Sequence, residues 1–166
     1  MKYCSVLFFA LLVFACSGSL PEEKRKAYRE ELERNQIVRV TEVEITEAAF
    51  REGRLTVNTL DSLAADTTAR NAFIEGYPGR ISLVTNVREA RHDLERQLFE
   101  AYAQDTTGVP HDNLQNVRND QGVVDSLLYS YPIVQADAGE KQRLVGVWNV
   151  WMAKRDIVLS ISLRKK

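Results

Sequence analysis

The sequence predicts an α+β protein, with helices in its first part and an antiparallel sheet in its last part. Between positions 43 and 64, apolar residues recur at broken three- and four-residue intervals, which indicates helix. In the last part, large apolar residues alternate with a set rich in Ser and Pro, which is typical of a strand. These alternating residues are Leu127, Tyr129, Tyr131 and Ile133.

Two helical segments are expected before the sheet. Residues 22–34 form a strongly charged run of good helix formers. Thr41 and Glu44 have the spacing of a capping box that opens the second segment. That segment runs to about position 64, either as one helix or as two helices that meet near Gly53.

The middle of the chain predicts a turn, a strand, a helix and a loop. Residues 75–79 contain two Gly and one Pro and predict a turn, and residues 81–85 predict a short strand. A helix is expected over about 90–103, and residues 105–116 predict a long polar connection. The buried face of that helix would carry Leu94, Leu98 and either Ala101 or Tyr102.

The last forty residues predict a sheet. Residues 126–133 and 144–151 read as strands, and the turn between them makes them expected antiparallel neighbours. Residues 157–163 alternate between large apolar and other residues, which favours a third strand. A helix that begins near Ala153 is the alternative.

The N-terminus predicts export and lipidation. Lys2 is followed by an apolar run from 6 to 15, and the run ends in Val-Phe-Ala-Cys, which has the pattern of a bacterial lipobox. We therefore expect a signal peptide over residues 1–15 and lipid attachment at Cys16. The apolar run is too short to span a bilayer as a helix. A plain secretory signal is the alternative reading.

Composition limits what the rest of the chain can be. Residues 16–36 predict a tether and a charged helix, and residues 37–166 have the length of a single domain. The charged helix reads as a solvated stalk, or else as a coiled-coil partner site. The formal net charge is −1 with both signs interspersed, which gives no basic patch for nucleic acid. The only two cysteines are Cys4 and Cys16, so the mature fold has no free thiol.

Four blocks of sequence occur in a recognisable order. The blocks are Ile-Ser-Leu-Val-Thr-Asn at 81–86, Leu-Glu-Arg-Gln-Leu-Phe-Glu-Ala-Tyr at 94–102, Asp-Ser-Leu-Leu-Tyr-Ser-Tyr-Pro-Ile at 125–133 and Val-Gly-Val-Trp at 145–148. Taken in this order, they resemble the periplasmic c-type haem sensor domains with a PAS-like fold. The resemblance implies a PAS-like antiparallel sheet packed by the N-terminal helices, and a sensory or ligand-binding role outside the cytoplasm.

The chain departs from that family where the haem would be attached. The family has a Cys-x-x-Cys-His loop between its last two blocks, but residues 133–145 contain neither Cys nor His. Covalent haem attachment is therefore chemically impossible there, and no cofactor is expected. Haem held without covalent bonds by His92 or His111 stays open, although neither residue matches a ligand position of the family.

The sequence gives no catalytic residue and no metal site. His92, Asp93 and Glu95 predict a solvent-exposed cluster that assists a helix start, because two ligands at that spacing do not close a metal site. His111 is expected at the surface. No Gly-x-Ser-x-Gly elbow and no phosphate-binding glycine loop is present. We therefore expect no enzyme.

Aromatic residues are the remaining candidates for a site. Tyr129, Tyr131 and Trp148 lie on adjacent predicted strands, where they line an apolar ligand pocket or fill the core, the commoner role. Trp148 and Trp151 should face opposite sides of the sheet, because they are three residues apart on one strand.

The expected function is that of a membrane-tethered bacterial envelope lipoprotein with a PAS-like sensory or ligand-binding domain. Its lipid would hold it to a membrane on the periplasmic side, and Ser17 after Cys16 favours the outer membrane. The alternative is a structural or adaptor lipoprotein that binds another envelope protein and has no small-molecule site.

Overall fold

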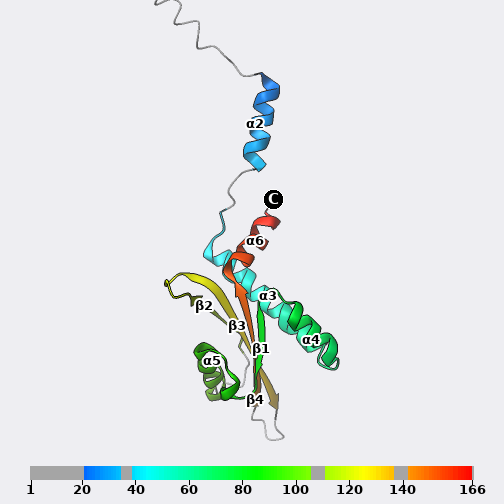
Figure 1. The fold of residues 1–166 in the computed structure, drawn as a ribbon, viewed down its shortest axis with the longest axis vertical. Coiled ribbons are helices and arrows are strands. Elements are labelled where there is room, and N and C mark those ends of the chain that lie inside the picture. The colour runs from blue at the N-terminus through cyan, green and yellow to red at the C-terminus, as the bar shows by residue number, and fades with distance from the viewer. Residues whose placement is uncertain (1–20, 35–38, 106–110, 137–141, 166) are drawn as a thin grey trace, which may run out of the picture. The chain divides into compact units, whose positions relative to one another are not determined.

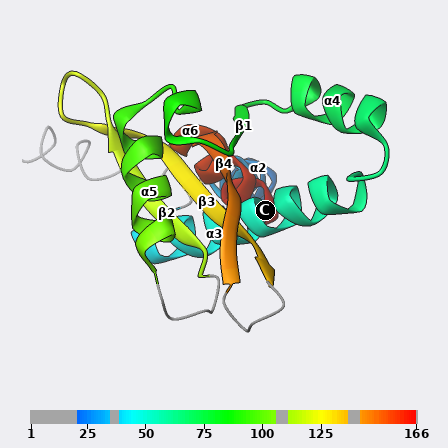
Figure 2. The same cartoon turned by 90° about the horizontal axis from the view of Figure 1, so that it is seen from below.

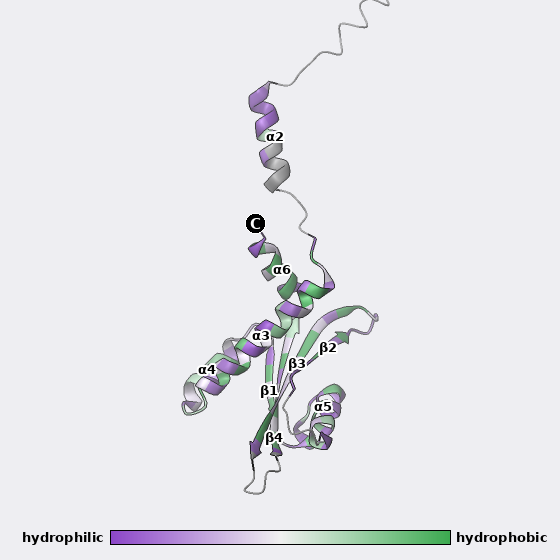
Figure 3. Cartoon of the chain, turned by 180° about the vertical axis from the view of Figure 1, so that it is seen from behind, coloured by the Kyte–Doolittle hydropathy of each residue, from purple (hydrophilic) through white to green (hydrophobic). Residues whose placement is uncertain are grey.

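The computed structural model describes residues 21–34, 39–105, 111–136 and 142–165. Contacts divide the chain into two compact units, Met1–Val38 and Arg39–Lys166. In the first unit the predicted charged helix is present as α2 (Glu22–Arg34), with Glu22 and Glu23 in its first turn, where carboxylates are favoured. Its residues are mostly hydrophilic (Figure 3). The expected signal peptide and tether and the expected lipid attachment at Cys16 lie outside the described residues.

The second unit begins with one long helix, α3 (Glu42–Ser62), which passes through Gly53 without a break. The predicted capping box is confirmed: Thr41 Oγ1 accepts from the amide of Glu44 at 3.3 Å, and Glu44 Oε2 accepts from the amide of Thr41 at 2.9 Å. The buried residues of α3 recur at helical spacing, so they lie on one face of the helix. That face packs against the sheet. The buried residues are Ile45, Ala48, Ala49, Gly53, Thr56, Val57 and Leu60.

A further helix that the sequence reading missed, α4 (Thr67–Gly76), follows α3. Asp66 caps it by accepting from the amide of Ala69 at 2.9 Å. None of its residues is fully buried, and only Phe73, Ile74 and the following Tyr77 pack against the core. An apolar stripe with so few residues shows little of the three- and four-residue spacing from which a helix is predicted.

Four antiparallel strands form one sheet in the order β1-β4-β3-β2. The strands are β1 (Arg80–Val84), β2 (Asn113–Arg118), β3 (Val124–Ala136) and β4 (Gln142–Ala153). The prediction that β3 and β4 are neighbours is confirmed, and Tyr131 is paired with Trp148. The expected polar connection over 105–116 is wrong in its last part, because Asn113 starts the edge strand β2.

The C-terminal segment is a helix, α6 (Lys154–Arg164), so the favoured third strand is wrong and the alternative is right. Ile157 and Ile161 are one helical turn apart and both are buried, whereas Leu159 and Leu163 are exposed. A period-two pattern and an i, i+4 pair coexist in this sequence. Burial of the i, i+4 pair against α3 and the sheet decides between them.

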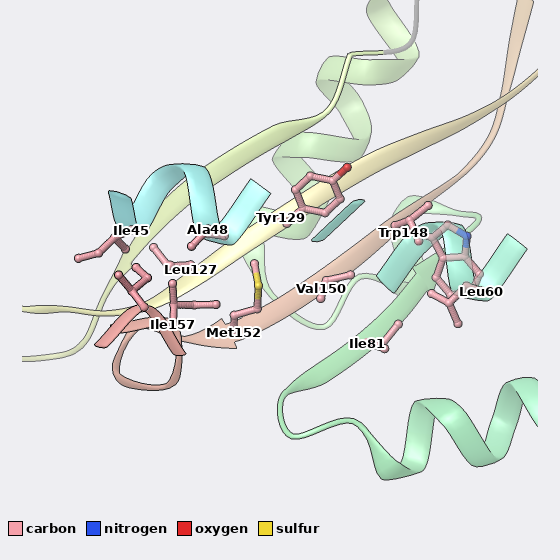
Figure 4. Close-up of a cluster of buried hydrophobic side chains, with 13 residues drawn as sticks. Ile45, Ala48, Leu60, Ile81, Leu127, Tyr129, Trp148, Val150, Met152 and Ile157 are labelled. Atoms are coloured by element: carbon pink, nitrogen blue, oxygen red, sulfur yellow. The ribbon is translucent and has the colours of Figure 1, made fainter. Parts of the chain in front are cut away.

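The two faces of the sheet are covered by different helices. The face that carries Tyr129, Trp148 and Val150 packs against α3 and α6 in the main apolar core (Figure 4). The other face meets α5 (Asp93–Gln104), which follows a short 3-10 turn, η2 (Val87–Glu89). In Figure 1, α5 lies to the left of β3 and β4 and α3 extends to the right; in Figure 2, α5 again lies to the left of these strands and α3 runs from left to right below it.

The fold is therefore α+β, with a four-stranded antiparallel sheet and, within the described ranges, five α-helices. None of those helices is both long and apolar enough to cross a membrane. The more specific likeness to the PAS-like family stays a prediction.

Candidate functional site

The candidate site is an open pocket of about 300 Å³ on the α3 face of the sheet. Two of the three predicted pocket residues, Tyr129 and Tyr131, come to it from β3, at alternate positions that point to the same face. The complete lining is Arg54, Val57, Asn58, Asp112, Tyr129 and Tyr131. We call it the Tyr131 pocket.

An ion pair at this pocket joins α3 to the residue before β2. Arg54 donates from Nε to Asp112 Oδ2 at 2.6 Å and from Nη2 to Oδ1 at 3.4 Å. The hydroxyl of Tyr129 donates to Asp112 Oδ2 at 3.1 Å. The hydrogen bond from Arg54, with that from Tyr129, holds the pKa of Asp112 below its ordinary value even though partial burial opposes the shift.

Tyr129 is a buried residue of the Tyr131 pocket, and it contacts both Asp112 and Phe50. Burial, reinforced by the negative charge of Asp112, raises the pKa of its hydroxyl, so the phenol stays a donor. The ring of Phe50 meets the Tyr129 ring edge-on at a centroid distance of 6.1 Å. Figure 4 shows the Tyr129 ring among core side chains, with its hydroxyl oxygen directed away from them.

Gly53 makes room for the Tyr129 ring. A Cβ at Gly53 would lie 2.3 Å from Cγ of Tyr129, so only glycine lets the helix and the ring approach this closely. Glycine in a helix interior costs about 1 kcal/mol relative to Ala. Its presence here is explained by this contact.

Trp148, the third predicted pocket residue, does not line the Tyr131 pocket. It is 5% exposed and belongs to the apolar core, where it lies beside Leu60 (Figure 4). The expectation that Trp148 and Trp151 face opposite sides is confirmed, since Trp151 contacts residues of the α5 face. In the sheet register Trp148 is the partner of Tyr131, so it lies beside that pocket residue on the same face of the sheet.

The opposite face carries a buried carboxylate, which corrects the sequence reading of Glu95 as solvent-exposed. The side chain of Glu95 is fully buried on α5. Its Oε1 accepts from Arg80 Nη2 at 2.8 Å, from Trp151 Nε1 at 2.8 Å and from Ser82 Oγ at 3.1 Å. Its Oε2 accepts from the amide of Arg91 at 3.0 Å. We call this group of residues the Glu95 cluster.

The bonds of the Glu95 cluster decide the charge state of the carboxyl group. Burial by itself would raise the pKa of Glu95, but the donors from Trp151, Arg91 and Ser82 and the charge of Arg80 outweigh it. The pKa therefore lies below the ordinary value and the group is ionised at neutral pH. Each oxygen is satisfied by donors, which is typical of a structural anchor rather than of a proton-transfer group.

His92, Asp93 and Glu95 do not form the single solvent-exposed cluster that the sequence predicted. His92 is the N-cap of α5 but makes no capping hydrogen bond with its side chain, and its ring lies 4.9 Å from that of Trp151. Asp93 pairs with Arg96 at the surface. His111 is exposed, as expected. In the part of the chain that the structure describes, no group of three or more His, Cys, Asp or Glu residues is placed to hold a metal ion.

The α5 face also carries polar residues from the strands, of which Ser130 and Asn149 are buried and Ser82 is half-buried. Ser82, Asn149 and Ser130 are successive partners across β1, β4 and β3. The hydroxyl of Tyr102 on α5 lies 3.0 Å from Ser130 Oγ. Asn149 Nδ2 donates to the carbonyl of Val147 at 3.5 Å, and Asn149 Oδ1 has no partner among the described residues.

A second groove, of about 220 Å³, lies between α3 and α6. It contains the pair between Lys165 Nζ and Glu44 Oε1 at 2.5 Å. Its other polar residues are charged and its apolar wall consists of Ala48 and Ile161. Its lining contains no aromatic side chain, which distinguishes it from the Tyr131 pocket.

Sequence reasoning missed Arg54, Asn58 and Asp112. Arg54 and Asp112 are 58 residues apart, and Asp112 follows a segment that reads as a polar loop. The available signal was weak: Arg54 lies one turn after Phe50, and Asn58 one turn after Arg54, on one edge of the buried face of α3.

Comparisons of the chain with protein-family models, curated proteins and solved structures found no match. The geometry of the described residues is therefore the basis for a functional proposal.

Proposed function

We propose that this chain is an envelope lipoprotein, anchored through Cys16, whose α+β unit binds a small molecule in the Tyr131 pocket and has a sensory or ligand-binding role. The carrying observation is the pocket itself. It combines a half-buried tyrosine with a small set of polar groups from α3 and the start of β2, the usual make-up of small-molecule sites.

The order of the elements is consistent with the PAS-like family resemblance. The four matched sequence blocks fall on β1, α5, β3 and β4 in that order, and the additional edge strand β2 lies between α5 and β3. In this proposal the domain has kept a PAS-like sheet and lost covalent haem, because the segment between Pro132 and Gly146 has no Cys or His.

The anchor follows from the lipobox. Two or three acyl chains on Cys16 would hold the protein stably, whereas one chain binds a membrane only marginally. The charged helix α2 would then serve as a spacer between the lipid and the second unit.

A second candidate function, an adaptor that binds another envelope protein, is favoured by one observation. Leu159 and Leu163 are 51% and 74% exposed and lie one turn apart on α6. Paired exposed leucines on a helix form the kind of anchor that partner proteins bind.

Thermal unfolding tests the binding proposal. The full-length protein in detergent would be heated while tryptophan fluorescence is recorded, because both tryptophans lie in β4. The compounds would be haem, amino acids, dicarboxylates, polyamines, sugars and fatty acids. We expect at least one to raise the melting temperature by about 5–11 °C when its concentration is about a hundredfold above its Kd.

Matched variants assign the effect to the pocket. Tyr131→Leu should abolish the ligand-induced shift, whereas Phe99→Leu, a half-buried aromatic on α5, should keep it. No shift with any compound, together with specific cross-linking of a partner through Leu159 or Leu163, would replace the binding proposal with the adaptor.

A further inference from the structure

We infer that the ligand of the Tyr131 pocket is a small zwitterion of the α-amino-acid class, with a carboxylate and an ammonium group on adjacent atoms. This inference rests on the proposed function, because it names the ligand of the same pocket. It comes from the pairing of one cation with one anion at the pocket and from the apolar wall beside them.

Arg54 can bind the carboxylate of such a ligand. The guanidinium group has five N–H donors, and the bonds to Asp112 use those on Nε and Nη2. The side chain is 61% exposed, so the remaining edge of the fork is open to solvent at the pocket. An arginine edge of this kind binds a carboxylate through two parallel hydrogen bonds.

Asp112 can bind the ammonium group. An ionised carboxylate offers about four acceptor positions, and three donors, two from Arg54 and one from Tyr129, already contact this one. Its side chain remains 20% exposed at the pocket. Because those donors keep the pKa of Asp112 low, the group stays charged across the neutral range.

Arg54 and Asp112 together carry no net charge. The pocket therefore disfavours ligands that carry a net charge. A simple carboxylic acid would pair with Arg54 but bring its negative charge close to Asp112 without compensation. A simple amine would meet the reverse problem beside Arg54. Charge mismatch of this kind is a common source of specificity. A zwitterion satisfies both groups, because Arg54 Nε and Asp112 Oδ2 are only 2.6 Å apart.

The rest of the pocket fits an apolar or aromatic side chain. Tyr131 supplies apolar surface beside the buried Val57, and the exposed Asn58 adds a donor and an acceptor. A volume of about 300 Å³ leaves room for a side chain beyond the charged head group. The groove between α3 and α6 also holds an ion pair, that of Lys165 with Glu44, but has no aromatic wall.

Calorimetric titration of the full-length protein in detergent tests the inference. The probes are the twenty L-amino acids, followed by the N-acetyl and the carboxamide derivatives of the best binder. We expect at least one amino acid with an apolar side chain to bind. Each derivative should bind at least tenfold more weakly, because the N-acetyl group removes the charge that would meet Asp112 and the carboxamide removes the charge that would meet Arg54.

Variants assign the two roles. Arg54→Gln should weaken binding of the parent amino acid at least tenfold and remove the discrimination against the carboxamide. Asp112→Asn should do the same for the N-acetyl derivative. Arg51→Gln, on the same helix but in the other groove, should leave the affinity unchanged. Circular dichroism of each variant verifies folding, and the comparison of derivatives on the unaltered protein does not depend on any variant.

Two results would overturn the inference. One is the absence of binding by all twenty amino acids. The other is equal affinity for an amino acid and for its N-acetyl or carboxamide derivative. If a compound of another class binds and Tyr131→Leu abolishes its binding, the proposal that this pocket binds a small molecule stands. The inference that the ligand is a zwitterion is then wrong. If nothing binds, both fall.

Discussion

Glu95 shows how a single residue decides the contact between a helix and a sheet. A buried carboxylate is strongly unfavourable unless its charge is paired and its oxygens accept hydrogen bonds. Arg80, Ser82, Trp151 and the amide of Arg91 provide both conditions. The guanidinium of Arg80 also lies 4.8 Å from the Trp151 ring, so the cation is held by two partners.

Replacement of Glu95 tests this role. Glu95→Gln removes the charge but keeps the size, and leaves donors of Arg80 and Arg91 without a charged acceptor. We expect a loss of about 2 kcal/mol in the free energy of unfolding, measured by urea denaturation with circular dichroism. Glu100→Gln, an exposed residue of the same helix, is the control and should change stability little. Equal stability of the two variants would contradict the role of Glu95.

The close contact at Gly53 leads to a second prediction about a single residue. Gly53→Ala should destabilise the protein by about 1–3 kcal/mol, because the new methyl group overlaps the Tyr129 ring. Gly76→Ala is the matched control, since a Cβ there meets nothing within 4 Å and alanine favours a helix. Thermal melts that rank Gly53→Ala at or above the unaltered protein would refute the close contact.

Ion pairs join the start of α3 to both ends of α6. Lys165 Nζ contacts Glu44, and Lys154 Nζ contacts Glu42 at 2.8 Å, so both ends of α6 are tied to the first turn of α3. The hydrogen bond from Lys165, together with that from the Thr41 amide, lowers the pKa of Glu44 to about 2. Glu44 therefore acts both in the capping box and in helix pairing.

Stability should depend on acid through this group. A lowered pKa means that the unfolded chain binds the proton first, so the contribution of Glu44 is complete above its ordinary value of 4.5 and is lost as pH falls towards 2. Melting temperatures measured from pH 6 to pH 2 should fall less steeply for Glu44→Gln than for the unaltered protein. Glu47→Gln, on the same helix, should follow the unaltered curve. Parallel curves for all three would show that Glu44 is not coupled to folding.

The elements also show which information a single sequence carries. The capping box, the strands β3 and β4 and the helix α5 could be predicted, because their signals lie in short-range spacing. The strand β2 could not, because a mostly polar segment becomes a strand only by pairing with β3. The burial of Glu95 and the pair of Arg54 with Asp112 depend on residues 56 and 58 positions apart, beyond any local pattern.

At the scale of the whole molecule, the proposal combines an anchor with a binding unit. The anchor makes its own prediction: mass spectrometry of the protein purified from its native membranes should find an acylated N-terminal Cys16 and no residues 1–15. Cys16→Ser should release the protein from the membrane fraction. An intact N-terminus, or an unmodified Cys16 in the soluble fraction, would remove the lipoprotein assignment but leave the pocket untouched.

The binding unit is tested most directly by locating the ligand. Two-dimensional amide NMR spectra of the full-length protein would be recorded during titration with the panel compound that raises the melting temperature most. We predict that the largest shift changes fall on Arg54, Asn58 and Tyr131, on two elements that meet at one pocket. Changes confined to other residues, such as those of the groove between α3 and α6, would contradict the assignment of the Tyr131 pocket as the binding site.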